Sequence, residues 1–197
     1  VEYRESVFVG YRYYDSANKA VQFPFGFGLS YTTFEYSDLT VSANSIKDTD
    51  EVTVSFKVKN TGSVEGAEVT QLYVKDNEST IYRPEKELRA FKKVFLKAGE
   101  EQTVTFTLGK RAFAYYNVNI HDWHVETGAF TICVGASSRD IKLTSEITVE
   151  STVDAIVPDY KATAPAYYSA DIMNVPDEQF KEVLGRELPP SAVVAYP

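Results

Sequence analysis

Hydrophobic and polar residues alternate in several short stretches between residues 36 and 150. In the clearest stretch, residues 51–59, every second position is apolar: Val52, Val54, Phe56 and Val58. Threonine, serine and lysine fill the positions between them. A period of two with one polar side is typical of an antiparallel strand that is buried on one face. The run Asn60-Thr61-Gly62 that follows is a turn signal.

Other stretches of the same kind predict further strands. They lie at residues 39–41, 68–74, 88–96, 102–108, 129–134 and 141–149. This gives seven or eight one-sided strands in about 115 residues, and two stacked sheets bury such strands most economically. The pattern therefore predicts an all-β sandwich over residues 36–150 that folds on its own.

The flanking segments lack this alternation. Residues 1–35 are rich in glycine and aromatic residues, with one short strand expected at Ser6–Val9. Residues 151–175 have no clear period, which indicates a linker or an arm that lies on a surface.

A short helix is expected after this linker. Pro176 suits a first helical turn, Asp177 favours the positive end of the helix dipole, and Gly185 ends the helix. We place the cap at Asn174 or Val175. A helix of about nine residues is marginal in isolation, so the apolar side that carries Phe180 is expected to dock on another surface.

Composition narrows the class of protein. Hydrophobic residues make up 44% and charged residues 24% of the 197 residues, as in soluble globular proteins. No apolar run approaches the ~18 residues that cross a bilayer, so no membrane partner is predicted. The first residues carry neither an initiator methionine nor a signal-peptide pattern, so we expect the natural N-terminus to lie further upstream.

The charge argues against nucleic acid as a partner. The net charge is −8, and its average field repels a phosphate backbone. Glutamates interrupt the most basic stretch, so a solvated face is the preferred interpretation of its cations: Arg83, Lys86, Arg89, Lys92 and Lys93.

Cys133 is the single cysteine, which leaves no internal disulfide. It lies in an apolar run, where a buried inert thiol is expected. A lone thiol fits a reducing compartment, which favours a cytoplasmic location without excluding secretion.

Two groups of residues resemble metal sites. His121, Asp122 and His124 are of types that bind zinc, but in a strand the two histidines point to opposite faces. A turn with a packed Trp123 is therefore the preferred interpretation. The acidic run Asp48–Glu51 could hold calcium, although such runs are usually solvated turns. No metal or cofactor is predicted.

Paired tyrosines could stack on sugar rings. These are Tyr115 with Tyr116, and Tyr167 with Tyr168. Adjacent residues of a strand point to opposite sides, so at most one of each pair can face a ligand. Packing in the core or at an interface is the preferred role.

Several motifs together resemble a known family. The runs GYRYYD at residues 10–15 and FPFGFGLSYTTF at residues 23–34 are similar to a junction in family 3 glycoside hydrolases, where a catalytic-side domain passes into a fibronectin type III-like domain. GAEVTQLYV (66–74), RPEKELRAFKKV (83–94) and VGASSRDI (134–141) resemble segments of that domain, in the same order. The resemblance implies an immunoglobulin or fibronectin type III-like β-sandwich at residues 36–150. It makes residues 1–35 the junction. The tail departs from the family's commonest layout, in which this domain comes last, and we expect residues 151–197 to be a linker arm and short helix that lead to a further domain.

The resemblance also implies what this chain does not do. The family hydrolyses β-linked glucosides and related sugars with retention, which needs two carboxyl groups about 5 Å apart. The family's nucleophile segment of the Ser-Asp-Trp type has no counterpart, because His121-Asp122 precedes Trp123. The acid/base glutamate is expected upstream of residue 1. No catalytic residue is therefore assigned to this chain.

We expect a non-catalytic structural domain that braces the missing catalytic domains of the same polypeptide, a retaining β-glucosidase. It is expected to offer a loop near the substrate entrance or a surface for a homo-oligomer. A carbohydrate-binding module is the alternative, and an adhesion or receptor-type domain is a third reading that explains fewer of the motifs.

The candidate site residues follow from the same resemblance. The expected interdomain interface consists of Tyr11, Arg12, Tyr13, Tyr14, Phe25, Phe27 and Phe180. Arg12 is expected to pair with a carboxylate across that boundary, and glycines 26 and 28 to allow close backbone approach. Asp76, Asn77 and Glu78 form the candidate loop at the substrate rim. With partner domains absent, residues 1–35 and the tail are expected to expose an apolar patch.

Overall fold

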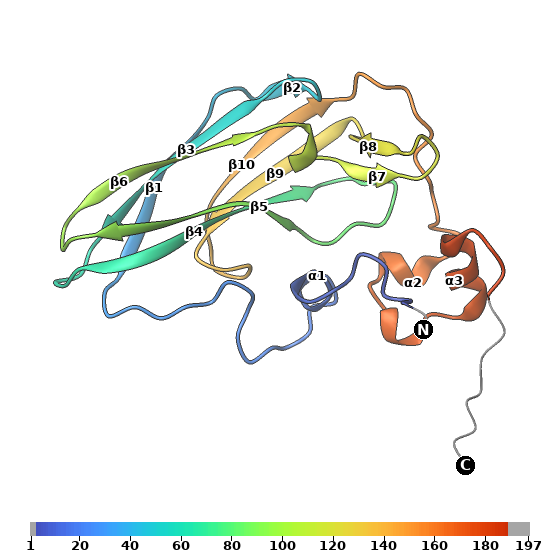
Figure 1. Cartoon of the computed structure of the whole chain (residues 1–197), viewed down its shortest axis with the longest axis horizontal. Coiled ribbons are helices and arrows are strands. Elements are labelled where there is room, and N and C mark those ends of the chain that lie inside the picture. Colours follow the sequence, from blue (N-terminus) through green and yellow to red (C-terminus); the bar gives the residue numbers. More distant parts are fainter. Residues whose placement is uncertain (1–2, 189–197) are drawn as a thin grey trace, which may run out of the picture.

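The computed structural model describes residues 3–188, which form two stacked β-sheets with short helices beside them (Figure 1). One sheet has the strand order β1-β3-β6, the other has the order β2-β10-β9-β4-β5, and β7 and β8 form a small third sheet. The strands are β1 (Phe34–Val41), β2 (Ser45–Lys47), β3 (Val52–Asn60), β4 (Gly66–Asp76), β5 (Glu87–Leu96), β6 (Glu101–Leu108), β7 (Tyr115–Asn117), β8 (Asp122–His124), β9 (Gly128–Gly135) and β10 (Ile141–Glu150). The predicted all-β sandwich is confirmed.

The core lies between the two large sheets. Strand β3 pairs with β1 and β6 in antiparallel register, and its alternating side chains are buried as the sequence predicts. They pack with inward residues of the facing sheet in one cluster, which includes Leu72, Val74, Ile132, Val134 and Ile147. Burying a side chain of this size contributes about 1.5–3 kcal/mol.

The sandwich has more strands than the seven or eight expected. The additional strands are β2, β7 and β8, each three residues long. A strand this short cannot display an alternating pattern. Strand β2 also pairs in parallel with β10, whereas the other pairs are antiparallel.

The Asn60 turn is confirmed, and it fixes more than the direction of the chain. The amide of Asn60 is fully buried and donates to the carbonyl oxygens of Val64 (2.8 Å) and Leu96 (3.1 Å). Its Oδ1 accepts from the Gly62 N–H (3.0 Å) and from Thr32 Oγ1 (2.6 Å). One side chain therefore ties the turn to the segment that leads into β1.

The flanking segments meet in a second buried cluster. This arm cluster consists of Phe8, Tyr82, Ala164, Tyr167, Ala170, Val175 and Phe180. The helices within residues 3–188 are α1 (Tyr11–Ser16), η1 (Lys110–Ala112), α2 (Pro165–Tyr168), η2 (Ile172–Asn174) and α3 (Asp177–Leu184). Figure 1 shows α1 below β4 and β5, and α2 and α3 farther to the right, beside the start of the chain.

Several local predictions for these segments were wrong. Residues 6–9 do not form a strand: residues 4–7 are a turn in which Ser6 has a φ of 51°, and the Phe8 N–H bonds the Glu5 carbonyl. Of the two expectations for residues 151–175, the arm fits better than the linker, because this segment contains α2 and η2 and packs in the arm cluster. Helix α3 begins one residue later than expected, with Pro176 at the cap.

The end of helix α3 is as predicted. Gly185 takes a left-handed φ of 70° there. Within residues 3–188, none of the helices has the length and apolar character needed to span a bilayer.

Candidate functional site

Helix α1 is held against the sandwich by a turn between β9 and β10. Arg139 Nη2 donates to the carbonyl oxygens of Tyr14 (3.0 Å) and Lys19 (2.8 Å), and its Nε bonds Asp15 Oδ1 (2.6 Å). Lys86 Nζ lies 3.8 Å from the other Asp15 oxygen. A helix of six residues is unstable alone, so these contacts position it.

Tyr11 and Arg12 make their contacts with the same chain. The Tyr11 ring stacks on Phe25 with centroids 4.4 Å apart, and its hydroxyl accepts from the Leu88 N–H (2.8 Å). Arg12 Nε lies 3.3 Å from Glu87 Oε1. We expected Arg12 to reach a carboxylate in another domain, whereas its partner in the structure belongs to β5 of the sandwich.

The other predicted interface residues differ in exposure. Tyr14, Phe25 and Phe27 are 44–46% exposed, and Tyr13 packs against the arm cluster. Phe180 was expected to dock on a missing domain, but it is 7% exposed inside the arm cluster. The apolar side of α3 is therefore covered by this chain itself.

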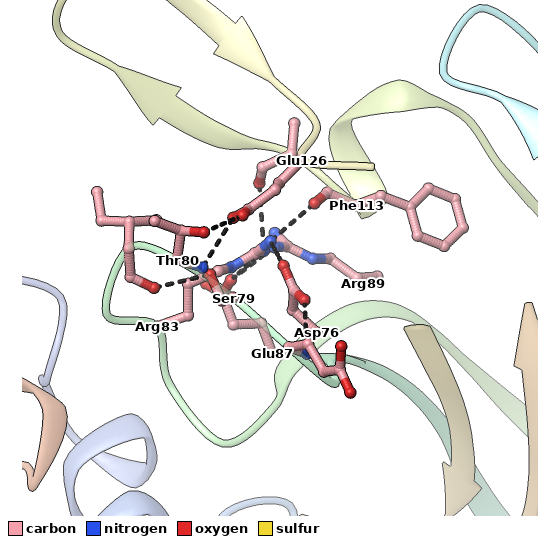
Figure 2. A network of polar contacts seen from close by, with 11 residues as sticks. Asp76, Ser79, Thr80, Arg83, Glu87, Arg89, Phe113 and Glu126 are labelled. Carbon is pink, nitrogen blue, oxygen red and sulfur yellow. Dashed lines mark hydrogen bonds and ion pairs between the residues drawn. The ribbon is translucent and has the colours of Figure 1, made fainter. Parts of the chain in front are cut away.

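A buried polar network joins the β4–β5 loop to the sandwich, and Figure 2 shows it from close by. Arg83, with 8% of its side chain exposed, lies 3.0 Å from Asp76 and 3.4 Å from Glu87. It also donates to the carbonyl oxygens of Phe113 (2.9 Å) and Ala114 (3.4 Å). One planar guanidinium thus connects three chain segments.

Three further sets of contacts complete this network. Glu87 Oε2 lies 2.6 Å from Arg89 Nη2, so Glu87 links two buried arginines. On the other side, Glu126 accepts from the Thr80 N–H (2.9 Å) and from the Thr80 hydroxyl. Ser79 Oγ closes the loop on the Ile81 carbonyl (2.7 Å). Burial raises the pKa of Asp76 although Arg83 opposes that shift, and burial lowers the pKa of Arg89.

This network overturns one interpretation of the sequence. We assigned the basic stretch to a solvated face, but the side chains of Arg83, Lys86 and Arg89 are only 8–18% exposed. Arg83 and Arg89 share the nearby Glu87, but Arg83 also bonds two carbonyl oxygens about thirty positions away and Lys86 meets Asp15 of α1. These distant contacts bury the stretch, and the local charge pattern does not show them. Lys92 and Lys93 are exposed, as expected.

The candidate rim loop is largely occupied by internal contacts. Asp76 is engaged by Arg83, and Asn77 bonds Thr131 Oγ1 (2.8 Å) and Glu146 (3.2 Å). Glu78 is the exposed member of the three.

The groups that resembled metal sites are structural. His124 is buried while His121 is exposed in a turn with a φ of 52°. Asp48 is buried and accepts from both the N–H and the hydroxyl of Thr152 (2.9 and 2.7 Å), with Lys110 3.8 Å away. Residues 3–188 contain no group of three or more His, Cys, Asp or Glu that could hold a metal ion.

The aromatic pairs are mostly packed. Tyr115 is buried and Tyr116 exposed, as expected for a strand. Trp123 and Tyr116 form a T-shaped pair, and the Arg111 guanidinium lies 3.4 Å from the centre of the Trp123 ring, so one face of that ring is already covered. Tyr167 and Tyr168 lie in α2, so the strand argument does not apply to them.

The chain is similar to known proteins both in a family model and over most of its sequence. The family model of the fibronectin type III-like domain matches residues 68–138. The chain is 60% identical over 153 residues to thermostable beta-glucosidase B of Acetivibrio thermocellus, covering 78% of this chain and 20% of that protein. It is 49% identical over 150 residues to the exo-alpha-(1->6)-L-arabinopyranosidase of Bifidobacterium breve, covering 76% and 19%. The chain thus spans about a fifth of the length of these relatives.

Solved structures agree. The GH3 beta-glucosidase of Bifidobacterium adolescentis superposes with a TM-score of 0.72 at 43% identity, over 85% of this chain and 25% of that chain. Beta-glucosidase 3B of Thermotoga neapolitana, solved in complex with glucose, gives a TM-score of 0.69 at 43% identity over 75% and 20%. The chain therefore carries a fibronectin type III-like domain and corresponds to the segment of family 3 β-glucosidases that holds this non-catalytic domain.

Proposed function

We propose that this chain braces the catalytic domains of a retaining family 3 glycoside hydrolase. The observation that carries the proposal is the continuous match of about three quarters of the chain to β-glucosidases. The polar network and the arm cluster support it, because both connect flanking segments to a rigid sandwich. Such contacts suit a domain that holds larger neighbours in a fixed position.

The partners in this proposal are catalytic domains of the same polypeptide, and both catalytic carboxylates lie in them. Among the described residues, the carboxylic acids whose pKa values burial raises are Asp76 and Glu68, and both already have structural partners. Asp76 contacts Arg83, and Glu68 accepts a hydrogen bond from Tyr36 (2.8 Å). These contacts support a bracing role rather than acid–base chemistry.

We propose β-linked glucosides as the substrates of the parent enzyme. The loop of residues 76–78 offers it Glu78 as a contact near the substrate entrance, and the outer surface of the sandwich offers a contact between copies. The relatives include a β-glucosidase and an arabinopyranosidase, which supports a sugar specificity set outside this domain.

Activity measurements test the proposal. The complete polypeptide should release nitrophenol from an aryl β-glucoside, and the 197-residue chain should not. Removing this segment from the complete polypeptide should lower its melting temperature and its activity together. An active complete enzyme that keeps both its activity and its melting temperature without the segment would contradict a bracing role.

Calorimetry with cellobiose distinguishes the alternative. A carbohydrate-binding module should bind the sugar at millimolar concentration or below. A brace should release no measurable heat.

A further inference from the structure

The outer face of the five-stranded sheet carries an apolar groove of about 660 Å³. Residues 25–31 form one wall, and Val69, Leu88 and Phe91 of β4 and β5 line the floor. Residues in and beside the groove are strongly exposed for apolar side chains: Phe27 (46%), Phe91 (68%), Phe95 (72%) and Leu29 (91%). Clustered exposure of this kind marks an interaction surface.

Strand register explains why these side chains gather on one face. Phe91 is the partner of Gln71, Phe95 of Ala67, and Lys93 of Val69. Directly paired residues of neighbouring strands point to the same side of a sheet. The groove floor is therefore a property of the β4–β5 pairing and does not depend on a mobile loop.

The wall of residues 25–31 is held by a buried amide. Gln71 is 3% exposed, and its Nε2 donates to the carbonyl oxygens of Gly26 (3.1 Å) and Ala136 (2.7 Å). The Tyr73 hydroxyl donates to its Oε1 (2.5 Å), which fixes the orientation of the amide. Gly26 has a φ of 80°, and a Cβ there would lie 2.0 Å from Gln71. The groove is thus preformed, which reduces the entropic cost of binding.

The other large sheet presents a different surface. Its outward side chains are small and polar along β3 and β6, for example Ser55 and Thr105, whose hydroxyls bond each other at 2.9 Å. Lys57 and Glu101 form an exposed ion pair on the same side. This face is polar and favours contact with water. The outer face of the five-stranded sheet is therefore the apolar face of the sandwich that a partner can contact.

Both flanking arms lie on the side of the groove. The Tyr11 ring of α1 stacks on Phe25 in the groove wall, and α1 leads into the arm cluster (Figure 1). Arg4 of the first arm bonds Asp177 of the last helix at 2.6 Å, so the two arms are neighbours. In the matched structures the corresponding segment is 20–25% of a single longer chain. We therefore expect the neighbouring parts of a longer polypeptide to approach the sandwich from the side of the groove.

We propose that the groove of residues 25–31, β4 and β5 receives an apolar surface of a catalytic domain from the same polypeptide. The inference rests on the proposed function and identifies the surface through which the domain braces its neighbours. Phe27, Phe91 and Leu29 form the centre of the contact, and Lys93 and Glu65 lie at its rim.

Hydroxyl-radical footprinting tests this surface directly. Oxidation of Phe27 and Phe91 is compared between the 197-residue chain and the complete polypeptide. In the complete polypeptide both should oxidise about tenfold more slowly, since the centre of an interface excludes water. Tyr116, at 48% exposure, is a matched control for Phe27 at 46%, and should react equally in both proteins.

The outcomes are separable. Equal oxidation of Phe27 and Phe91 in both proteins overturns the inference, whatever the activity of the complete polypeptide. Protection that appears in the 197-residue chain as its concentration rises also overturns it, in favour of a second copy. Protection in a complete polypeptide without glycosidase activity keeps the interface but refutes the proposed function.

A variant provides an independent readout. Phe91→Thr keeps a residue that favours strands, so the melting temperature of the 197-residue chain should hardly change. The complete polypeptide should melt at a lower temperature than its wild type, and the control Tyr116→Thr should not. If both variants of the complete polypeptide have the melting temperature of the wild type, the inference is wrong.

Discussion

Replacing Arg83 by methionine should destabilise the chain strongly. The change removes ion pairs to Asp76 and Glu87 and hydrogen bonds to two carbonyl oxygens, and it leaves Asp76 buried with 5% of its side chain exposed. Breaking a buried pair by removing one partner costs about 3–5 kcal/mol. For a domain of this size that loss corresponds to a fall in melting temperature of about 6–20 °C.

The measurement is urea denaturation of the 197-residue chain at several pH values. The penalty should shrink as the pH falls, because burial already raises the pKa of Asp76 and the loss of Arg83 removes the group that opposes that shift. A protonated Asp76 is neutral and tolerates burial better. Adding Asp76→Asn should therefore recover part of the lost stability near neutral pH.

An exposed pair supplies the control. Lys142 Nζ lies 2.7 Å from Asp140, with both side chains well exposed, so Lys142→Met should cost about 0–1 kcal/mol. If Arg83→Met costs as little as this control, the network does not hold the β4–β5 loop, and the reasoning from burial is wrong.

Three further changes test other parts of the structure. Gly26→Ala should cost at least about 1–2 kcal/mol in a thermal melt, because of its left-handed backbone and its contact with Gln71; Gly28→Ala, with open space around it, should change stability by less than about 0.5 kcal/mol. Burial and the nearby Lys110 lower the pKa of His124 from 6.5, so the unfolded chain takes up the proton first and stability should fall as the pH drops below about 6.5; a His124→Leu variant with an unchanged slope between pH 7 and 5 would refute this. Phe180→Ala should accelerate hydrogen exchange in α3 and leave β3 protected, because the arm cluster is separate from the sandwich core; equal acceleration in both would show a single cooperative unit.

The sandwich could be predicted because its information is local. In β3 apolar and polar residues alternate from Val52 to Lys59, and the inward residues of that stretch are all apolar. The burial of Arg83 could not be predicted in this way. Its partners Phe113 and Ala114 are about thirty positions away, and a surface arginine and a buried one look alike in the sequence.

The arm cluster was missed for a related reason. Helices α1 and α2 have six and four residues, too few to form without tertiary contacts or to show a helical period. Phe8 and Tyr167 pack through Tyr82, which comes from a different part of the chain. The prediction for the glycines was half right: Gly26 approaches Gln71 closely, whereas nothing lies within 4 Å of a Cβ at Gly28.

The contact between Arg4 and Asp177 has a mechanical consequence. These residues are separated by 173 positions, yet they are bonded at 2.6 Å, so tension applied through the flanking polypeptide loads the arm cluster before it reaches the sandwich. The strands of the sandwich run from Phe34 to Glu150, so they all lie between Arg4 and Asp177 in the sequence. In a pulling experiment the arms should yield first, as a small extension at low force, while the two sheets stay folded behind them.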